Sequence, residues 1–256
     1  MTHLIFMLFR TLPFLFLLSA SCAASDSGIP EMILVEGGEF RMGDTHESGD
    51  ADELPIRTVE LSDFYIAKTE ITVKQWRAYC QSTRRPMPPE PAWGWIDDYP
   101  IVNITWSDAV AYCEWLSERT GKRYRLPTEA EWEFAARGGN KSKGYLFSGG
   151  NEVTLIGVFD SLSPTQPQPV KGKLANELGI FDMSGNVWEW CIDWYAPSYT
   201  DSHRTVNPLG AQTGNHRVIR GGGWVAPATD LRVSNRWRSE PNIPRNYLGF
   251  RPVMEK

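Results

Sequence analysis

The sequence predicts a mixed fold of helices and short strands joined by much irregular backbone. The first observation is composition: 22 glycines and 18 prolines favour turns, while eleven tryptophans supply large side chains that anchor such segments. The second is a set of helix-start signals, and the third is a series of short runs with the pattern of strands. At 256 residues the chain is long enough for one substantial core, and no boundary indicates a second domain.

Extended segments are expected early in the folded part. Residues 32–35, 58–61 and 64–66 are apolar or alternating runs of strand length. The acid-rich segment 44–52 between them also contains Ser, Thr and Gly. We interpret it as a mobile, solvated loop, and a second cation site is the alternative.

Three helices are expected from capping chemistry. Thr72 and Gln75 form a capping box for a helix that should run to about residue 81. Ser107 is the expected cap of a second helix, which follows a strand over residues 101–106 and ends at Gly121. One face of this helix should be buried, because four residues recur at helical spacing: Ala109, Tyr112, Cys113 and Leu116.

The third helix should follow Thr128 and end at about Arg137. Its acids Glu129, Glu131 and Glu133 could suggest catalysis. Acids in a first helical turn are more simply explained by capping and by the helix dipole.

The segment 179–195 combines tryptophans, carboxylates and a Ser-Gly-Asn turn. On a strand, Glu189 and Asp193 would share a face with Val187, and a buried carboxylate needs donors or a cation. The turn would bring Asp182 and Glu189 toward one point with backbone carbonyls between them, an arrangement that suits Ca²⁺. The alternative is that these acids form salt bridges to arginines.

The N-terminal residues 1–23 are interpreted as a secretory signal. An apolar run follows Arg10, is too short for a comfortable membrane span, and precedes small residues suited to cleavage. Cys22 resembles a bacterial lipoprotein site, so lipidation of Cys22 and plain cleavage stay open. Either way we expect export, to the periplasm or as a lipoprotein of the outer membrane, with any membrane contact made only through that lipid anchor.

The remaining cysteines allow two interpretations. In an oxidising compartment Cys80 could pair with Cys113, leaving Cys191 single. The alternative is three buried, unreactive thiols.

Several function classes lack support in the sequence. A net charge of −5 gives no reason to expect nucleic acid, and no zinc motif, nucleophile elbow or phosphate-binding glycine loop is present. The C-terminal part is rich in arginine, and these side chains could stack on tryptophans, pair with the carboxylates or line an anionic groove: Arg217, Arg220, Arg232, Arg236, Arg238 and Arg245.

Six motifs in order resemble one family. They are Gly37-Gly-Glu-Phe-Arg-Met-Gly43, residues 64–72, Tyr124 to Glu133, Gly179 to Tyr195, Arg220-Gly-Gly-Gly-Trp224 and Gly249-Phe-Arg251. Together they are similar to the sulfatase-modifying-factor domain of formylglycine-generating enzymes, over residues 30–253. The resemblance implies an α+β fold, the formylglycine-generating-enzyme type of C-type-lectin-like fold, which has little regular secondary structure.

The resemblance also implies metal sites. Calcium in this family would be bound here by the side chains of Asp182 and Glu189 and by the carbonyls of Gly185 and Val187. Copper(I) in the authentic enzymes is held by two cysteines, but the corresponding positions here are Ala226 and Leu231. Because soft thiolates are what copper(I) prefers, copper is not expected.

We therefore expect an exported, calcium-stabilised domain that binds a polypeptide or other ligand in the family's groove. The alternative is a protein-modifying oxidase of the formylglycine-generating class. For each groove residue, core packing or ion pairing competes with ligand contact. The residues expected to line the groove are Trp188, Trp224, Arg232, Arg236, Arg238 and Asn246.

Overall fold

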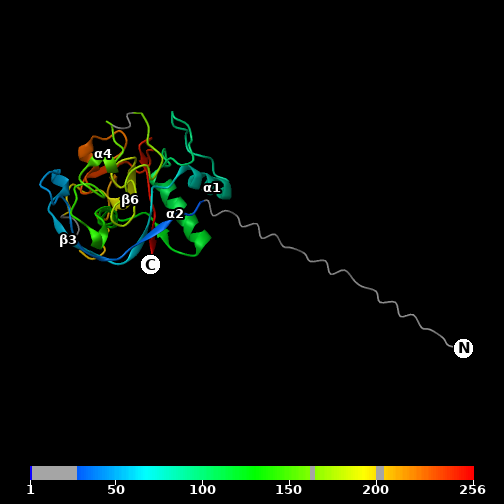
Figure 1. Ribbon diagram of the computed structural model, residues 1–256, viewed down its shortest axis with the longest axis horizontal. Coiled ribbons are helices and arrows are strands. Elements are labelled where there is room, and N and C mark those ends of the chain that lie inside the picture. The colour runs from blue at the N-terminus through cyan, green and yellow to red at the C-terminus, as the bar shows by residue number, and fades with distance from the viewer. Residues whose placement is uncertain (2–27, 162–164, 200–204) are drawn as a thin grey trace.

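The computed structural model describes Met1 and residues 28–161, 165–199 and 205–256. The expected signal segment 1–23 and the lipidation site Cys22 lie outside the described residues. Within the described ranges, two four-stranded sheets, a two-stranded sheet and a few short helices are connected by long irregular segments (Figure 1). No helix in these ranges is both long and apolar enough to cross a membrane.

The first sheet joins the two ends of the folded chain. Its order is β1 (Met32–Val35), β4 (Phe64–Ala67), β10 (Val253–Glu255) and β5 (Tyr124–Arg125), with antiparallel pairing throughout. The C-terminal strand therefore lies between two strands from the first half of the chain. Strands β2 (Gly38–Met42) and β3 (Arg57–Leu61) form a separate antiparallel pair.

The second four-stranded sheet is built around β6 (Trp188–Trp194). Its order is β8 (Arg236–Ser239), β7 (Arg217–Arg220), β6 and β9 (Leu248–Gly249). Strand β6 pairs antiparallel with β7 and parallel with β9, so it is covered on both edges. An irregularity in the β6–β7 register lies between Trp190 and Trp194.

The three predicted helices are confirmed. They are α1 (Val73–Thr83), α2 (Trp106–Thr120) and α3 (Glu129–Ala136), and α1 and α3 begin with the predicted capping boxes. The cap of α2 is Thr105 rather than Ser107, because Asp108 lies three residues after Thr105 and completes the box. Short helical segments complete the list: η1 (Ala51–Glu53), η2 (Gly139–Lys141), α4 (Val153–Ile156) and η4 (Ala228–Leu231).

The strand predicted over residues 101–106 is wrong. Ile101, Val102 and Ile104 are buried as that pattern required, but the positive φ of 59° at Asn103 interrupts the extended chain. The backbone N–H of Ile101 donates a hydrogen bond to the Ile71 carbonyl over 2.8 Å. These apolar side chains are therefore buried although residues 101–106 do not form a strand.

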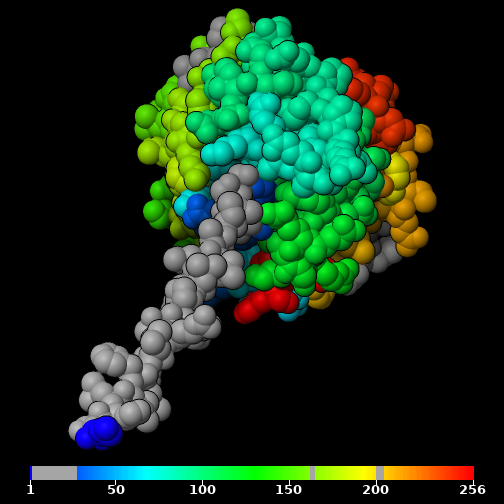
Figure 2. Space-filling view, turned by 90° about the vertical axis from the view of Figure 1, so that its right-hand side faces the viewer, coloured from blue at the N-terminus to red at the C-terminus, as the bar shows by residue number. Residues whose placement is uncertain are grey.

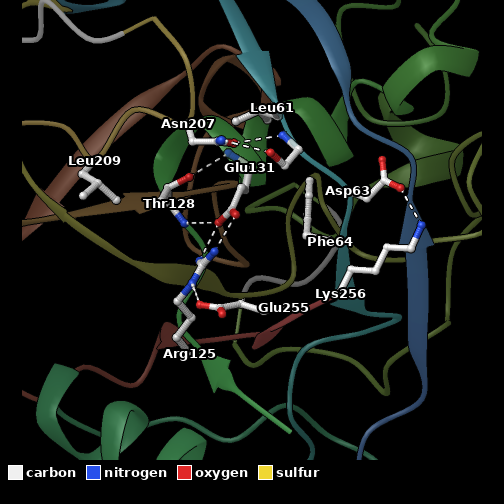
Figure 3. A pocket seen from close by; sticks show the side chains of 11 residues that line it. Leu61, Asp63, Phe64, Arg125, Thr128, Glu131, Asn207, Leu209, Glu255 and Lys256 are labelled. Atoms are coloured by element: carbon white, nitrogen blue, oxygen red, sulfur yellow. Dashed lines mark hydrogen bonds and ion pairs between the residues drawn. The ribbon is translucent and has the colours of Figure 1, made fainter.

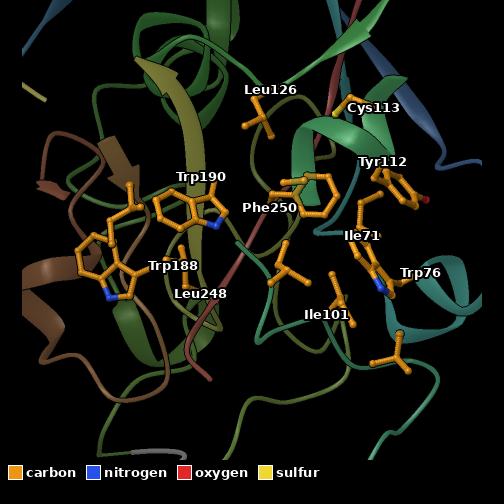
Figure 4. Close-up of a cluster of buried hydrophobic side chains, with 14 of the residues drawn as sticks. Ile71, Trp76, Ile101, Tyr112, Cys113, Leu126, Trp188, Trp190, Leu248 and Phe250 are labelled. Carbon is orange, nitrogen blue, oxygen red and sulfur yellow. The ribbon is translucent and has the colours of Figure 1, made fainter. Parts of the chain in front are cut away.

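The main core lies between the first two helices and strand β6 (Figure 4). Trp76 of α1 stacks on Tyr112 of α2 with ring centroids 5.4 Å apart, and Phe250 meets both rings edge-on. Trp190, completely buried, belongs to the same cluster. Large aromatic side chains thus hold together elements with little regular backbone pairing.

The expected disulfide between Cys80 and Cys113 is not formed. All three described cysteines are buried free thiols, and the Cys80 thiol donates a hydrogen bond to the Pro86 carbonyl over 3.4 Å. Burial raises the pKa of all three thiols, which keeps them protonated. The alternative interpretation, three unreactive buried thiols, is the one that holds.

Candidate metal centre

Strand β6 buries acids on its core face, as the sequence predicted. Val187, Glu189, Cys191 and Asp193 alternate along the chain, and each is at most 3% exposed. Charges in this position require partners because burial of an unpaired ion is strongly unfavourable. Each buried carboxylate on this strand therefore requires a group that compensates its charge.

Arginine compensates Glu189. The fully buried Arg251 donates from Nε and Nη2 to the two carboxylate oxygens, both at 2.7 Å, and Trp132 adds its indole N–H at 2.8 Å. For Glu189 the salt-bridge alternative is thus realised. The carboxylate accepts three hydrogen bonds, and with about four lone-pair positions it retains capacity for one more ligand.

Asp182 lies at the entry to the Ser-Gly-Asn turn that precedes β6. The backbone of this turn is left-handed at Asp182, Gly185 and Asn186, with φ of 60°, 100° and 65°. The backbone N–H of Lys171 donates to Asp182 over 2.8 Å. Burial raises the pKa of Asp182 to about 6, and Glu189 acts in the same direction.

Glu70 is a member of the site that the sequence analysis missed. It follows β4, is 0% exposed, and neither carboxylate oxygen has a hydrogen-bond partner. Burial raises the pKa of Glu70 well above its usual value, Asp182 and Glu189 raise it further, and Arg251 opposes them. An acid among apolar neighbours in the segment Phe64–Thr72 was the signal that could have found it.

The charges in this cluster do not balance. Among the described residues, the carboxylates of Glu70, Asp182 and Glu189 act on one another's charge, and the buried Arg251 acts on all three. Their oxygens are not all within 4.8 Å of one another. Ionised together, they leave two surplus negative charges in a buried space. A divalent cation with oxygen ligands fits this deficit in both charge and chemistry, and the residues present therefore suit calcium.

Comparison with known proteins places the chain in a family. A family model described as the sulfatase-modifying factor enzyme 1-like domain matches residues 19–256. The chain belongs to this family. The predicted family and the mixed α+β fold are both confirmed.

Relatives in this family carry different names. The formylglycine-generating enzyme of Streptomyces coelicolor is 32% identical over 283 residues, covering 86% of this chain and 87% of that protein. Serine/threonine-protein kinase pkn1 of Chlamydia pneumoniae is 34% identical over 247 residues, which are 87% of this chain but only 38% of the kinase. The structure of PvdO from Pseudomonas aeruginosa superimposes with a TM-score of 0.81 and 28% identity, covering 91% of this chain and 96% of that one.

The two positions at which the family resemblance places the copper cysteines are apolar and buried. Ala226 is 4% exposed and Leu231 is 0% exposed, and both belong to the main core. Neither side chain offers a metal ligand, and the described cysteines lie on α1, α2 and β6 as protonated thiols. The residues at these positions therefore do not fit copper(I).

Two of the arginines expected in the groove are buried in ion pairs instead. Arg232 pairs with Glu53 through two hydrogen bonds of 2.8 Å, and Arg236 pairs with Glu129 at 2.6 and 2.8 Å. Their side chains are 6% and 3% exposed, so they cannot line an open surface. Both guanidinium groups are held in the interior by charge-assisted hydrogen bonds to buried carboxylates.

The acids of α3 likewise do more than cap the helix. Glu131 is both the capping-box acid and the partner of Arg125, whereas Glu129 and Glu133 extend into the interior. Glu133 binds Arg220 and Arg137. Burial alone would raise the pKa of Glu129, but Arg236 and Arg220 outweigh it and hold that pKa below its usual value.

Of the other predicted groove residues, two are buried and two are exposed. Trp188 is packed in the main core at 4% exposure, and Trp224 is 7% exposed with its indole N–H donating to the Asn246 carbonyl over 3.3 Å. Asn246 and Arg238 are exposed at the surface. Trp93 of the Pro-rich segment meets Trp224 edge-on at 5.5 Å, which adds an aromatic residue from elsewhere in the chain.

A polar pocket of 260 Å³ is lined in part by Thr128 and Glu131 at the start of α3 (Figure 3). Arg125 reaches from β5 to Glu131 and to Glu255, and Lys256 pairs with Asp63 at 2.7 Å. Arg123 also pairs with Glu255, at 3.0 Å, so three bases balance the three acids. The pocket therefore offers no uncompensated charge to a ligand, unlike the cluster around Glu70.

Proposed function

We propose that this chain is a calcium-stabilised binding domain of the sulfatase-modifying-factor family that recognises a polypeptide without copper-dependent oxidation. The observation that carries the proposal is the pair of buried apolar side chains, Ala226 and Leu231, at the copper positions. The resemblance to formylglycine-generating enzymes, one of which is 32% identical to this chain, implies a polypeptide as the ligand class.

The aromatic cluster beside the lost copper positions supports the proposed binding role. Trp224 belongs to a small buried cluster, against which Trp93, Trp95 and Tyr247 pack as partly buried side chains. Partly exposed indoles and phenols supply large contact areas at low cost in side-chain entropy. We define these four residues as the aromatic patch and propose that the polypeptide contacts it next to Asn246.

The copper-free part of the proposal has a direct test. The purified protein is incubated with copper(I), O₂ and a Cys-x-Pro-x-Arg peptide, and the peptide is analysed by mass spectrometry. We expect the peptide to be recovered with its thiol intact, because no ligand pair for copper is present at the family positions. Conversion of the cysteine to an aldehyde would establish the oxidase function instead.

The binding part is tested with a displayed library of random peptides. We expect enriched peptides whose affinity falls about tenfold or more when Trp93 or Trp224 is replaced by alanine, since such anchors contribute on the order of 1.4 kcal/mol or more. Trp237, which is 52% exposed and outside the patch, provides the matched control as Trp237→Ala. If the enriched peptides bind the Trp93 and Trp224 variants with unchanged affinity, the aromatic patch is not the binding surface.

We propose that calcium is held by the carboxylates of Asp182 and Glu189 together with the carbonyls of Gly185 and Val187, and that the buried Glu70 adds a negative charge that favours the ion. Bound there, the ion would supply the positive charge that the buried carboxylates lack. At a hundredfold excess over Kd it should stabilise the folded state by about 2.7 kcal/mol, and a chelator should reverse this. Differential scanning calorimetry in CaCl₂ and in EDTA measures the effect.

Matched variants locate the effect at this cluster. Asp182→Asn and Glu70→Gln should each abolish most of the calcium-dependent shift in melting temperature, while Asp63→Asn, an exposed acid paired with Lys256, should leave it unchanged. A calcium shift that survives both cluster variants would place the ion elsewhere. If calcium does not shift the melting temperature of the wild-type protein, the surplus negative charge is relieved by protonation of Glu70 instead.

The pH dependence without calcium follows from the raised pKa of Asp182. Its folded pKa of about 6 exceeds the unfolded value, so its stabilisation is complete below the unfolded pKa and is lost as pH rises through about 6. In EDTA, unfolding free energy should fall by on the order of 3 kcal/mol between about pH 4 and pH 6 through this group. Asp182→Asn should flatten that part of the urea-unfolding profile, and saturating calcium should do the same.

We also propose that the protein is exported through residues 1–23, with Cys22 as the site of any lipid anchor. The support is the order of a basic residue, an apolar run and small residues in that segment.

A further inference from the structure

A cavity of 590 Å³ lies between α1, the start of α2 and the Pro-rich segment, and none of the acids of the metal cluster lines it. Figure 2 looks onto the side of the molecule where the chain around α1 (cyan to teal) adjoins the green segment that includes α2. The deeper wall is apolar and formed by Trp76, Tyr79 and Ile104. The size and lining are those of a small-molecule site.

The outer wall is a strap of four residues, Pro86-Met-Pro-Pro89, held at both ends. The Cys80 thiol donates to the Pro86 carbonyl over 3.4 Å, and the Asn103 side-chain amide donates to the Pro89 carbonyl over 2.8 Å. Three prolines fix the backbone φ of the strap and remove its N–H donors. The strap is therefore stiff, which keeps the cavity open and lowers the ordering cost of binding.

The cavity has one available charge. Arg85 is exposed at its rim with the guanidinium 5.9 Å from the Tyr79 ring centroid, and no carboxylate in the described ranges forms an ion pair with it. Asp108 also lines the cavity, but its Oδ2 accepts from the backbone and hydroxyl of Thr105 at 3.0 and 2.6 Å as the cap of α2. The rim thus presents a cation whose charge is not already used.

We propose that this cavity binds a small monocarboxylate with a bulky aromatic or aliphatic body. The body would lie on Trp76, Tyr79 and Ile104 under the strap, and the carboxylate would pair with Arg85. A guanidinium recognises a carboxylate through two parallel hydrogen bonds. A dianion is disfavoured because Asp108 carries a negative charge on the same cavity. This site is independent of the calcium cluster and of the aromatic patch.

The test compares two probes of one shape, 2-naphthoate and the neutral 2-naphthalenemethanol, by isothermal titration calorimetry on the whole protein. We expect saturable binding of both, with naphthoate at least tenfold tighter. Arg85→Gln should remove that difference, whereas the neighbouring exposed Arg84, changed to Gln, should preserve it. Equal affinities for the two probes, or equal effects of the two variants, would overturn the proposal.

One further variant tests the location. Met87 is a half-buried residue of the strap that lines the cavity, and the larger side chain of Met87→Trp should fill part of it. The affinity for both probes should fall at least tenfold. Absence of saturable binding in the wild-type protein, or unchanged affinity in Met87→Trp, would show that the cavity is not the site.

Discussion

Replacing Arg251 by methionine is expected to lower the unfolding free energy by roughly 3–5 kcal/mol, because it leaves a buried carboxylate without its partner. Arg251 is completely buried and is the bidentate partner of Glu189. Its loss would leave Glu189, Asp182 and Glu70 together with no buried cation. Urea unfolding in the presence of a chelator measures the change.

The control is the surface pair Lys256–Asp63, which has the same 2.7 Å separation but side chains that are 54% and 38% exposed. Lys256→Met should change stability by no more than about 1 kcal/mol, since solvent screens exposed pairs. Calcium should also recover part of the Arg251→Met loss by supplying charge to the same carboxylates. A small loss that calcium does not alter would show that Glu189 is not held as described.

The local features of this fold could be predicted from the sequence. Capping boxes at Thr72 and Thr128 were recognised because the cap and its acid or amide lie three residues apart. The same rule fits Thr105 with Asp108, two residues before the predicted cap Ser107. Where apolar residues simply needed burial, as at Ile101, the sequence did not distinguish a strand from irregular buried chain.

The site was predicted only where its residues are neighbours in the sequence. Asp182 and Glu189 belong to one turn and strand, so their convergence followed from local geometry. Arg251 lies 62 residues after Glu189, and no spacing rule connects them. Glu70 was missed for the same reason: an acid in a strand-like segment becomes unusual only once its complete burial is known.

The distribution of arginines shows why groove residues were harder to assign. Arg217 stacks between Trp106 and Trp194 at 3.9 and 3.5 Å, while Arg232 and Arg236 bind buried acids. All three outcomes, stacking, pairing and surface exposure, use the same residue type. The choice depends on partners as distant as Glu53, which is 179 residues from Arg232.

Replacing Arg236 by methionine is expected to be about as destabilising as the change at Arg251, roughly 3–5 kcal/mol. Arg236 binds Glu129 through two short hydrogen bonds and also donates to the carbonyls of Asp52 and Ala196. It therefore joins β8 to α3 and to two loops at once. Without it, the Glu129 carboxylate would stay buried with only Arg220, 3.7 Å away, to balance it.

A double-mutant cycle with Glu129→Gln separates the ion pair from the rest of this arrangement. Glu129→Gln alone should also destabilise, because it leaves Arg236 charged and unpaired, but the double variant should lose less than the sum of the two single losses. We expect a coupling energy of about 1–3 kcal/mol from urea unfolding. Additive losses would mean that Arg236 acts mainly through the Asp52 and Ala196 carbonyls, and that the interior acids of α3 are compensated by Arg220 rather than in pairs.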